Sequence, residues 1–225
     1  MAVLAVGGLY AYCTKDMPRM EVFRNPAKHA QLLEAQHPIG GDTPYTIEPV
    51  RYEEIPELLV AMYLVSSNSG YFTTDGHDFG CAHSPLDALI MLFASDFFRS
   101  RDIDFYIRHD MRRLLTFRLA ASLDKKQILC AYLNTMRYPG NAFGLKAGAQ
   151  FLFNKNLHAL SIAESATLML LDINRWTNLE RVLGDMYERR SWLLGRLRDR
   201  KIITQEEYHS AMAERISIPG LGIMK

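Results

Sequence analysis

The chain has 225 residues, of which 48% are hydrophobic, so it can bury one sizeable core and does not need a second domain. Its 26 Lys and Arg nearly balance its 25 Asp and Glu, which excludes the strong net charge typical of nucleic-acid-binding proteins. We therefore expect no nucleic-acid partner. The three cysteines, Cys13, Cys81 and Cys130, form no CxxC pair, and we interpret them as small core or surface residues.

The N-terminal part divides into two segments. Residues 1–12 (MAVLAVGGLYAY) are apolar but shorter than the roughly 20 residues of a membrane-spanning helix. They also lack the basic start and the cleavage site of a signal peptide. This segment fits either a buried helix end or the stub of a membrane anchor that continues upstream. Residues 13–43 are polar, contain prolines and end in Gly40-Gly41, which indicates a linker with room for one short helix.

Residues 44–225 are predicted to form an all-α domain with one short extended segment near its start. Tyr45–Tyr52 alternates weakly between polar and apolar residues, as a strand would. From Glu54 onward we expect about eight helices, since start signals precede several apolar runs. These signals are Pro56, Ser84-Pro85 with Asp87, and the capping boxes Asp124–Gln127, Ser161–Glu164 and Thr204–Glu207; a further amphipathic helix is predicted between Arg175 and Arg200.

The segment KKQILCAYLNTMRYPGNAFGLKAGAQFLFNK, which begins at Lys125, is followed by LSIAESATL. Both resemble the signatures KxxILxxYLNxxxxGxxxxGxxxAAxxYFxK and LSxxExAxLA of glycosyltransferase family 51, the peptidoglycan glycosyltransferase domain of penicillin-binding proteins. Two further stretches are similar to other parts of that family, namely RDRKIITQEEYHSAMAERI near the C-terminus and EEIPELLVAMYLV upstream of the signature. The resemblance implies a lysozyme-like helical fold, which agrees with the helical pattern found independently.

Within the signature, Pro139-Gly140-Asn141 is suited to a turn with left-handed backbone. Two interpretations of the signature residues stay open. They contact substrate, or they only hold helices together. The candidates are Tyr132, Asn134, Gly140, Gly144 and Lys155.

The resemblance also implies where catalysis should occur, and the expected glutamates are missing there. The general base belongs to a motif EDxxFxxHxG, but residues 67–76 read SNSGYFTTDG, so Ser67 occupies the position of the base. A serine without an adjacent base cannot take over this role. The second motif, GxSTITQQLxKN, corresponds to CAHSPLDALIML at residues 81–92. The third, RKxxE, corresponds to residues 108–112, where Arg108 matches and Arg112 replaces the second glutamate. We therefore expect no catalytic residue at these positions.

Arg108 and Arg112 lie four residues apart, which places them on one helix face. In the family this face turns toward the cleft, so the pair is a candidate site for an anionic substrate group. The alternative is a solvated basic stripe that continues to Arg113 and Arg118.

Residues 75–87 contain six residues of metal-binding types, but no known zinc spacing, and we expect neither a metal nor a cofactor. These residues are Asp75, His77, Asp78, Cys81, His83 and Asp87.

The leading hypothesis is a catalytically inactive glycosyltransferase-like protein of the bacterial cell envelope, attached to the inner membrane by its N-terminal segment with a periplasmic domain. It would retain binding of a lipid-linked peptidoglycan precursor or a glycan strand, or a role in assembly. One alternative is an active glycosyltransferase with a displaced carboxylate, for which the candidates are Asp75, Asp78 and Asp87, with Asp75 the best of them. Another is a structural partner of a cell-wall synthase or other envelope protein that binds no glycan.

Overall fold

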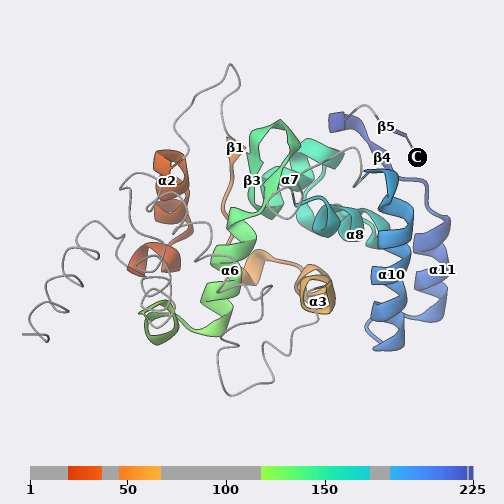
Figure 1. The fold of residues 1–225 in the computed structure, drawn as a ribbon, viewed down its shortest axis with the longest axis horizontal. Coiled ribbons are helices and arrows are strands. Elements are labelled where there is room, and N and C mark those ends of the chain that lie inside the picture. The colour runs from red at the N-terminus through yellow and green to blue at the C-terminus, as the bar shows by residue number, and fades with distance from the viewer. Residues whose placement is uncertain (1–19, 37–45, 67–117, 173–182, 222, 225) are drawn as a thin grey trace, which may run out of the picture.

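The computed structural model describes residues 20–36, 46–66, 118–172, 183–221 and 223–224, most of which are helical (Figure 1). The predicted helical class is confirmed. The helices are η1 (Met20–Arg24), α2 (Pro26–Gln36), η2 (Tyr52–Glu54), α3 (Glu57–Ser66), α6 (Lys125–Thr135), η3 (Pro139–Asn141), α7 (Gly144–Phe153), η4 (Leu157–Ala159), α8 (Ile162–Leu170), α10 (Met186–Asp199), α11 (Gln205–Ala213) and η6 (Pro219–Leu221). The strands are β1 (Thr46–Ile47), β2 (Arg137–Tyr138), β3 (Ala142–Phe143), β4 (Ser217–Ile218) and β5 (Ile223–Met224).

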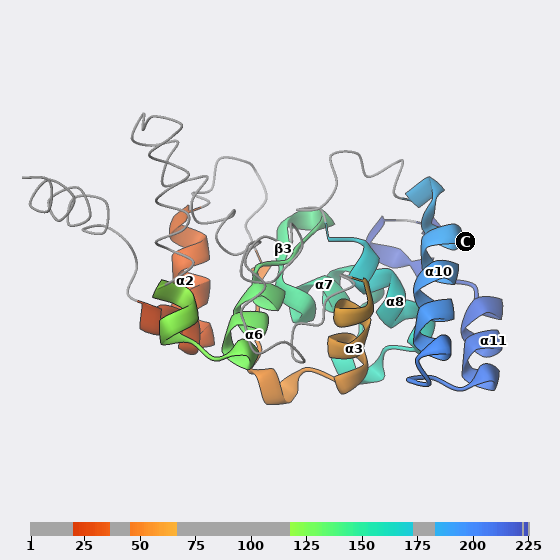
Figure 2. The same ribbon diagram turned by 60° about the horizontal axis from the view of Figure 1, so that its bottom comes forward.

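The helices are arranged around α6, α7 and α8. α2 lies at one end of the molecule, and α10 and α11 lie side by side at the other (Figures 1 and 2). α3 contacts α8 and α10. The core between these helices is apolar and includes fully buried side chains such as Tyr63, Leu129, Leu133 and Tyr138. Burial of this surface provides the main favourable contribution to folding.

All three predicted capping boxes within the described residues are present. At the start of α6, the Gln127 backbone N–H donates to Asp124 Oδ1 (2.8 Å), and the Asp124 N–H donates to Gln127 Oε1 (3.1 Å). The same reciprocal pairing begins α8 at Ser161 and α11 at Thr204. Each box satisfies backbone donors that a helix start would leave unpaired, so these starts follow from local sequence.

The predicted extended segment is confirmed, and it belongs to a small sheet. β1 pairs parallel with β3, with Thr46 opposite Ala142, and β3 pairs antiparallel with β2. The sheet joins the chain before α3 to the loop between α6 and α7. An ion pair between Lys146 Nζ and Glu48 Oε2 (3.0 Å) supports the same junction.

η1 and α2 lie within the segment predicted as a linker, and both contact α6. Phe23 and His29 are buried, with their rings edge to face at a centroid distance of 5.3 Å. The anchor segment proposed for residues 1–12 lies outside the described residues. Among the helices that the structure does describe, none is long and apolar enough to cross a bilayer.

Candidate functional site

The signature helix α6 is joined to the chain after β1 through Asn134. Its Nδ2 donates to the Val50 carbonyl oxygen (2.9 Å), and its Oδ1 accepts from the Val50 N–H (2.9 Å). Only 2% of Asn134 is exposed. The amide therefore pairs with the Val50 backbone much as a neighbouring strand would, and it satisfies two polar groups that are buried away from water.

Tyr132 lies two positions earlier on α6 and contacts other elements. Its ring lies 5.1 Å from that of Tyr63 on α3, and its hydroxyl donates to Asp172 Oδ2 (3.2 Å). Asp172 is fully buried, and its Oδ1 accepts from the Arg137 N–H (3.1 Å). The carboxylate thus connects α6, β2 and the end of α8. Our sequence analysis missed Asp172, although a lone carboxylate directly after the apolar run of α8 must find donors if it is buried.

The loop between α6 and α7 has the left-handed backbone that its sequence predicts. The φ angles of Gly140, Asn141 and Gly144 are 73°, 56° and 84°. A Cβ atom at Gly140 would lie 2.1 Å from the Phe151 ring, so the loop packs against α7 too closely for any side chain. The Gly144 N–H donates to the Met136 carbonyl (2.8 Å), which closes the loop. Both glycines are thus required by the backbone itself.

Lys155 follows α7 and forms an ion pair with Glu164 in the first turn of α8. Its Nζ lies 2.7 and 2.9 Å from the two carboxylate oxygens. Glu164 also completes the capping box with Ser161, and the Ser161 hydroxyl donates to Glu214 Oε1 (2.6 Å). The Glu164 side chain is 11% exposed, against 43% for Lys155. The lysine therefore neutralises a largely buried carboxylate at a helix junction.

Each described candidate of the signature thus has an observed role inside the fold, while substrate contact stays a prediction. The structure brings Gly144 next to Asn134, since a Cβ atom at Gly144 would lie 3.3 Å from the Asn134 carbonyl oxygen. Tyr132 instead contacts α3 and Asp172, and Lys155 lies beyond the other end of α7. The remaining candidates, Ser67, Asp75, Arg108 and Arg112, and the cluster at residues 75–87 lie outside the described residues.

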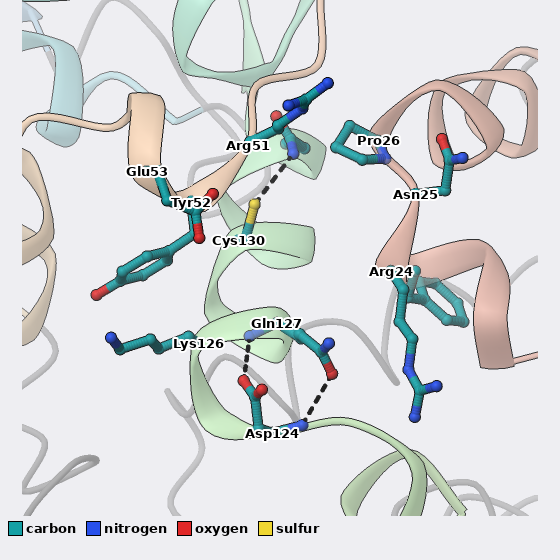
Figure 3. Close-up of a pocket in the computed structure, with 12 residues that line it drawn as sticks. Arg24, Asn25, Pro26, Arg51, Tyr52, Glu53, Asp124, Lys126, Gln127 and Cys130 are labelled. Carbon is teal, nitrogen blue, oxygen red and sulfur yellow. Dashed lines mark hydrogen bonds between the residues drawn. The ribbon is translucent and has the colours of Figure 1, made fainter.

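A pocket of about 420 Å³ lies between η1, the start of α2, η2 and α6 (Figure 3). Several of its polar groups already have partners. Lys126 Nζ lies 5.4 Å from the centre of the Tyr52 ring, and Arg24 donates to the Ser122 carbonyl. The lining residues are Phe23, Arg24, Asn25, Pro26, Arg51, Tyr52, Glu53, Asp124, Lys126, Gln127, Cys130 and Asn134.

The thiol among the described residues of the pocket lining is not activated as a nucleophile. Cys130 donates its thiol proton to the Val50 carbonyl (Sγ–O distance 3.3 Å). Burial, with a smaller contribution from Glu53 and Glu54, raises the pKa of this thiol to about 12. It therefore stays protonated near neutral pH, and a thiol is a poor nucleophile compared with a thiolate.

Residues 107–198 match the family model described as transglycosylase. The resemblance to glycosyltransferase family 51 is confirmed. The matched transglycosylase segment contains α6, α7, α8 and most of α10, together with Arg108 and Arg112. The structure describes residues 118–172 and 183–198 of the matched segment.

The curated relatives of this transglycosylase segment are penicillin-binding proteins. The chain is 27% identical over 186 residues to penicillin-binding protein 1A of Haemophilus influenzae, covering 75% of this chain and 21% of the relative. It is 28% identical over 183 residues to penicillin-binding protein 4 of Bacillus subtilis, covering 75% and 29%. The crystal structure of the Haemophilus influenzae protein matches with a TM-score of 0.47 and 24% identity, covering 77% of this chain and 18% of that chain. The chain thus spans less than a third of the length of these relatives.

Proposed function

We propose that this protein binds lipid-linked peptidoglycan precursor or glycan in the bacterial cell envelope and does not polymerise it. One contrast carries the proposal. The scaffold from Lys125 onward folds with its helix starts and turns in place, whereas Ser67 and Arg112 occupy the positions that the resemblance assigns to the two catalytic glutamates.

The chemistry of these two positions supports a loss of polymerisation. The acceptor hydroxyl has to give up a proton to a general base, and a serine hydroxyl does not take that proton near neutral pH. Two buried carboxylates of the matched segment are poor substitutes. Asp172 is fully buried and accepts from Tyr132 and Arg137, and Glu164 is paired with Lys155.

Retention of binding is supported by charge. An arginine in place of a glutamate changes the local charge by about two units, which removes repulsion toward an anion. Arginine presents a planar set of donors that matches phosphate oxygens. Arg108 and Arg112, one helical turn apart in sequence, can therefore hold a pyrophosphate-bearing ligand without consuming it.

The same proposal places the protein in the inner membrane, with residues 1–12 as part of an anchor and the helical domain in the periplasm. The apolar segment directly before a polar stretch supports this arrangement. A cell-wall synthase or another envelope protein is the expected partner there.

The test combines a polymerisation assay with a binding assay, both with purified lipid-linked precursor. We expect no glycan product, and binding that weakens with salt and with Arg112→Glu or Arg108→Ala. Arg215→Glu is a matched control, because it reverses the charge of an exposed arginine after α11 and should leave binding unchanged.

Two results would contradict the proposal. Glycan product that disappears in Asp75→Ala would show an active enzyme with a displaced carboxylate. Binding that neither arginine substitution changes at low ionic strength would remove the anion site and favour a protein partner that binds no glycan.

A further inference from the structure

The pocket of Figure 3 lies between elements that also pack on one another, and we call it the α2–α6 cavity. Its two sides face each other, with Arg24 and Pro26 on η1 and α2, and Cys130 and Gln127 on α6 (Figure 3). Both η1 and α2 contact α6. The volume of about 420 Å³ falls within the roughly 300 to 1,000 Å³ that small-ligand sites usually have. The cavity is therefore large enough for a compact organic molecule.

The floor of the α2–α6 cavity offers a ligand mainly apolar contact. It is formed by the buried side chains of Phe23, Cys130 and Asn134. The polar atoms of this floor already have partners, because the Cys130 thiol and Asn134 Nδ2 donate to the Val50 carbonyl oxygen. Asn134 Oδ1 accepts from the Val50 N–H. A ligand that reaches the floor therefore meets an aromatic ring and a sulfur atom, which favour an apolar group.

The rim of the cavity carries charges of both signs that the fold does not pair. Arg51, Glu53 and Lys126 line the cavity and are exposed. Within the part of the chain that the structure describes, none of these three side chains forms an ion pair. Arg51 and Glu53 stay apart although only one residue separates them in the sequence. A guanidinium and a carboxylate are therefore both available to a ligand at the same rim.

The other charges of the lining are engaged in the fold. Arg24 donates to the Ser122 carbonyl, and Asp124 accepts from the backbone at the start of α6. Glu54, beside the cavity, accepts from the Arg51 N–H (2.7 Å). The lining has three Lys or Arg and two Asp or Glu, and Glu54 brings the carboxylates to three. Positive and negative charges thus balance, which favours neither a simple anion nor a simple cation.

We infer that the α2–α6 cavity binds a small zwitterion of the amino-acid or short-peptide class that carries an apolar side chain. Arg51 presents planar donors that match the two oxygens of a carboxylate. Glu53 offers a carboxylate to an ammonium group. The apolar side chain lies against Phe23 and Cys130 at the floor. The inference rests on described residues alone and does not depend on the proposed function.

The test is isothermal titration calorimetry of the full chain with four probes. These are leucine, leucyl-leucine, N-acetyl-leucyl-leucine, which lacks the ammonium, and leucyl-leucine amide, which lacks the carboxylate. We expect an uncapped probe to bind and each capped dipeptide to bind roughly tenfold or more weakly, because one charged hydrogen bond is lost. Tighter binding of leucyl-leucine than of leucine assigns the site to a peptide, and the reverse order assigns it to a free amino acid.

Two substitutions assign each end of the ligand to its partner. Arg51→Gln should weaken leucyl-leucine about tenfold but leave leucyl-leucine amide unchanged, since the amide has no carboxylate to lose. Glu53→Gln should weaken leucyl-leucine but leave N-acetyl-leucyl-leucine unchanged. The matched controls Arg215→Gln and Glu206→Gln remove exposed charges after and on α11, and both should bind like the parent chain.

Three results would overturn the inference. The first is no heat of binding with either leucine or leucyl-leucine. The second is equal affinity for the free and capped dipeptides, because the charges would then play no part. The third is equal weakening by Arg51→Gln and Arg215→Gln, because net charge rather than the cavity would then explain binding. Each of these results leaves the proposal for precursor binding untouched.

Discussion

Asn134 gives the sharpest test of whether a signature residue acts inside the fold. Asn134→Ala removes two buried hydrogen bonds to Val50, each of 2.9 Å, and leaves the Val50 N–H without this acceptor. A buried hydrogen bond contributes about 1 kcal/mol, and an unpaired buried donor costs about 1 to 3 kcal/mol. The Val50 carbonyl keeps its contact with Cys130. We therefore expect the free energy of unfolding to fall by about 2 to 4 kcal/mol.

Urea denaturation measures this change. The midpoint should move to lower urea with an unchanged slope, because the folded state loses stability rather than compactness. Asn156→Ala is the matched control, since Asn156 is exposed and its side chain makes no capping bond at η4. It should change the stability by less than about 0.5 kcal/mol.

The result also separates the two interpretations of the signature. If Asn134 acts only in the fold, Asn134→Ala that remains folded should bind precursor as the parent chain does. A loss below about 1 kcal/mol, equal to that of Asn156→Ala, would refute the reasoning, since two buried bonds cannot be removed at so small a cost.

Three further predictions follow from other contacts. Burial lowers the pKa of His29 from 6.5 to about 4, so between these values the side chain is protonated only in the unfolded chain. The free energy of unfolding should therefore fall by roughly 1.4 kcal/mol per pH unit as the pH decreases through that window. Urea denaturation of His29→Gln at several pH values should show a weaker dependence of this free energy on pH. Gly140→Ala should lower the free energy of unfolding by about 2 to 4 kcal/mol, because Gly140 has a φ of 73° and an added Cβ atom would clash with Phe151. In thermal unfolding, Gly140→Ala/Phe151→Leu should regain the part of the stability lost to the clash, but not the part lost to backbone strain. Lys155→Ala should reduce stability in urea by more than Lys146→Ala, because its carboxylate partner is 11% rather than 41% exposed; equal effects would contradict this assignment.

Local chemistry explains why much of the fold could be predicted from sequence. Helix starts at Asp124, Ser161 and Thr204 follow from side chains that bond to backbone groups three residues away. The turn at Gly140 follows from a residue that tolerates positive φ. The family resemblance likewise rests on the order of residues along the chain, and it is confirmed by the match over residues 107–198.

The candidate site was predicted less completely, because residue identity does not determine which partner a side chain meets. The spacing from the signature assigns Ser67 and Arg112 to the glutamate positions, and this assignment stays a prediction. Tyr132 and Lys155 were candidates for substrate contact, with a purely structural role as the other interpretation. Their bonds to Asp172 and Glu164 came only from the structure.

What the sequence by itself determined is therefore three helix starts, the left-handed turn and the family resemblance of residues 107–198. All of these depend on neighbours within a few residues or on linear order. Tertiary structure alone decided that Asn134 pairs with Val50, 84 residues away. It also decided that Asp172 is buried against Tyr132, and that α2 packs on α6. Buried polar groups must find partners, and only the packed chain determines which partners are within reach.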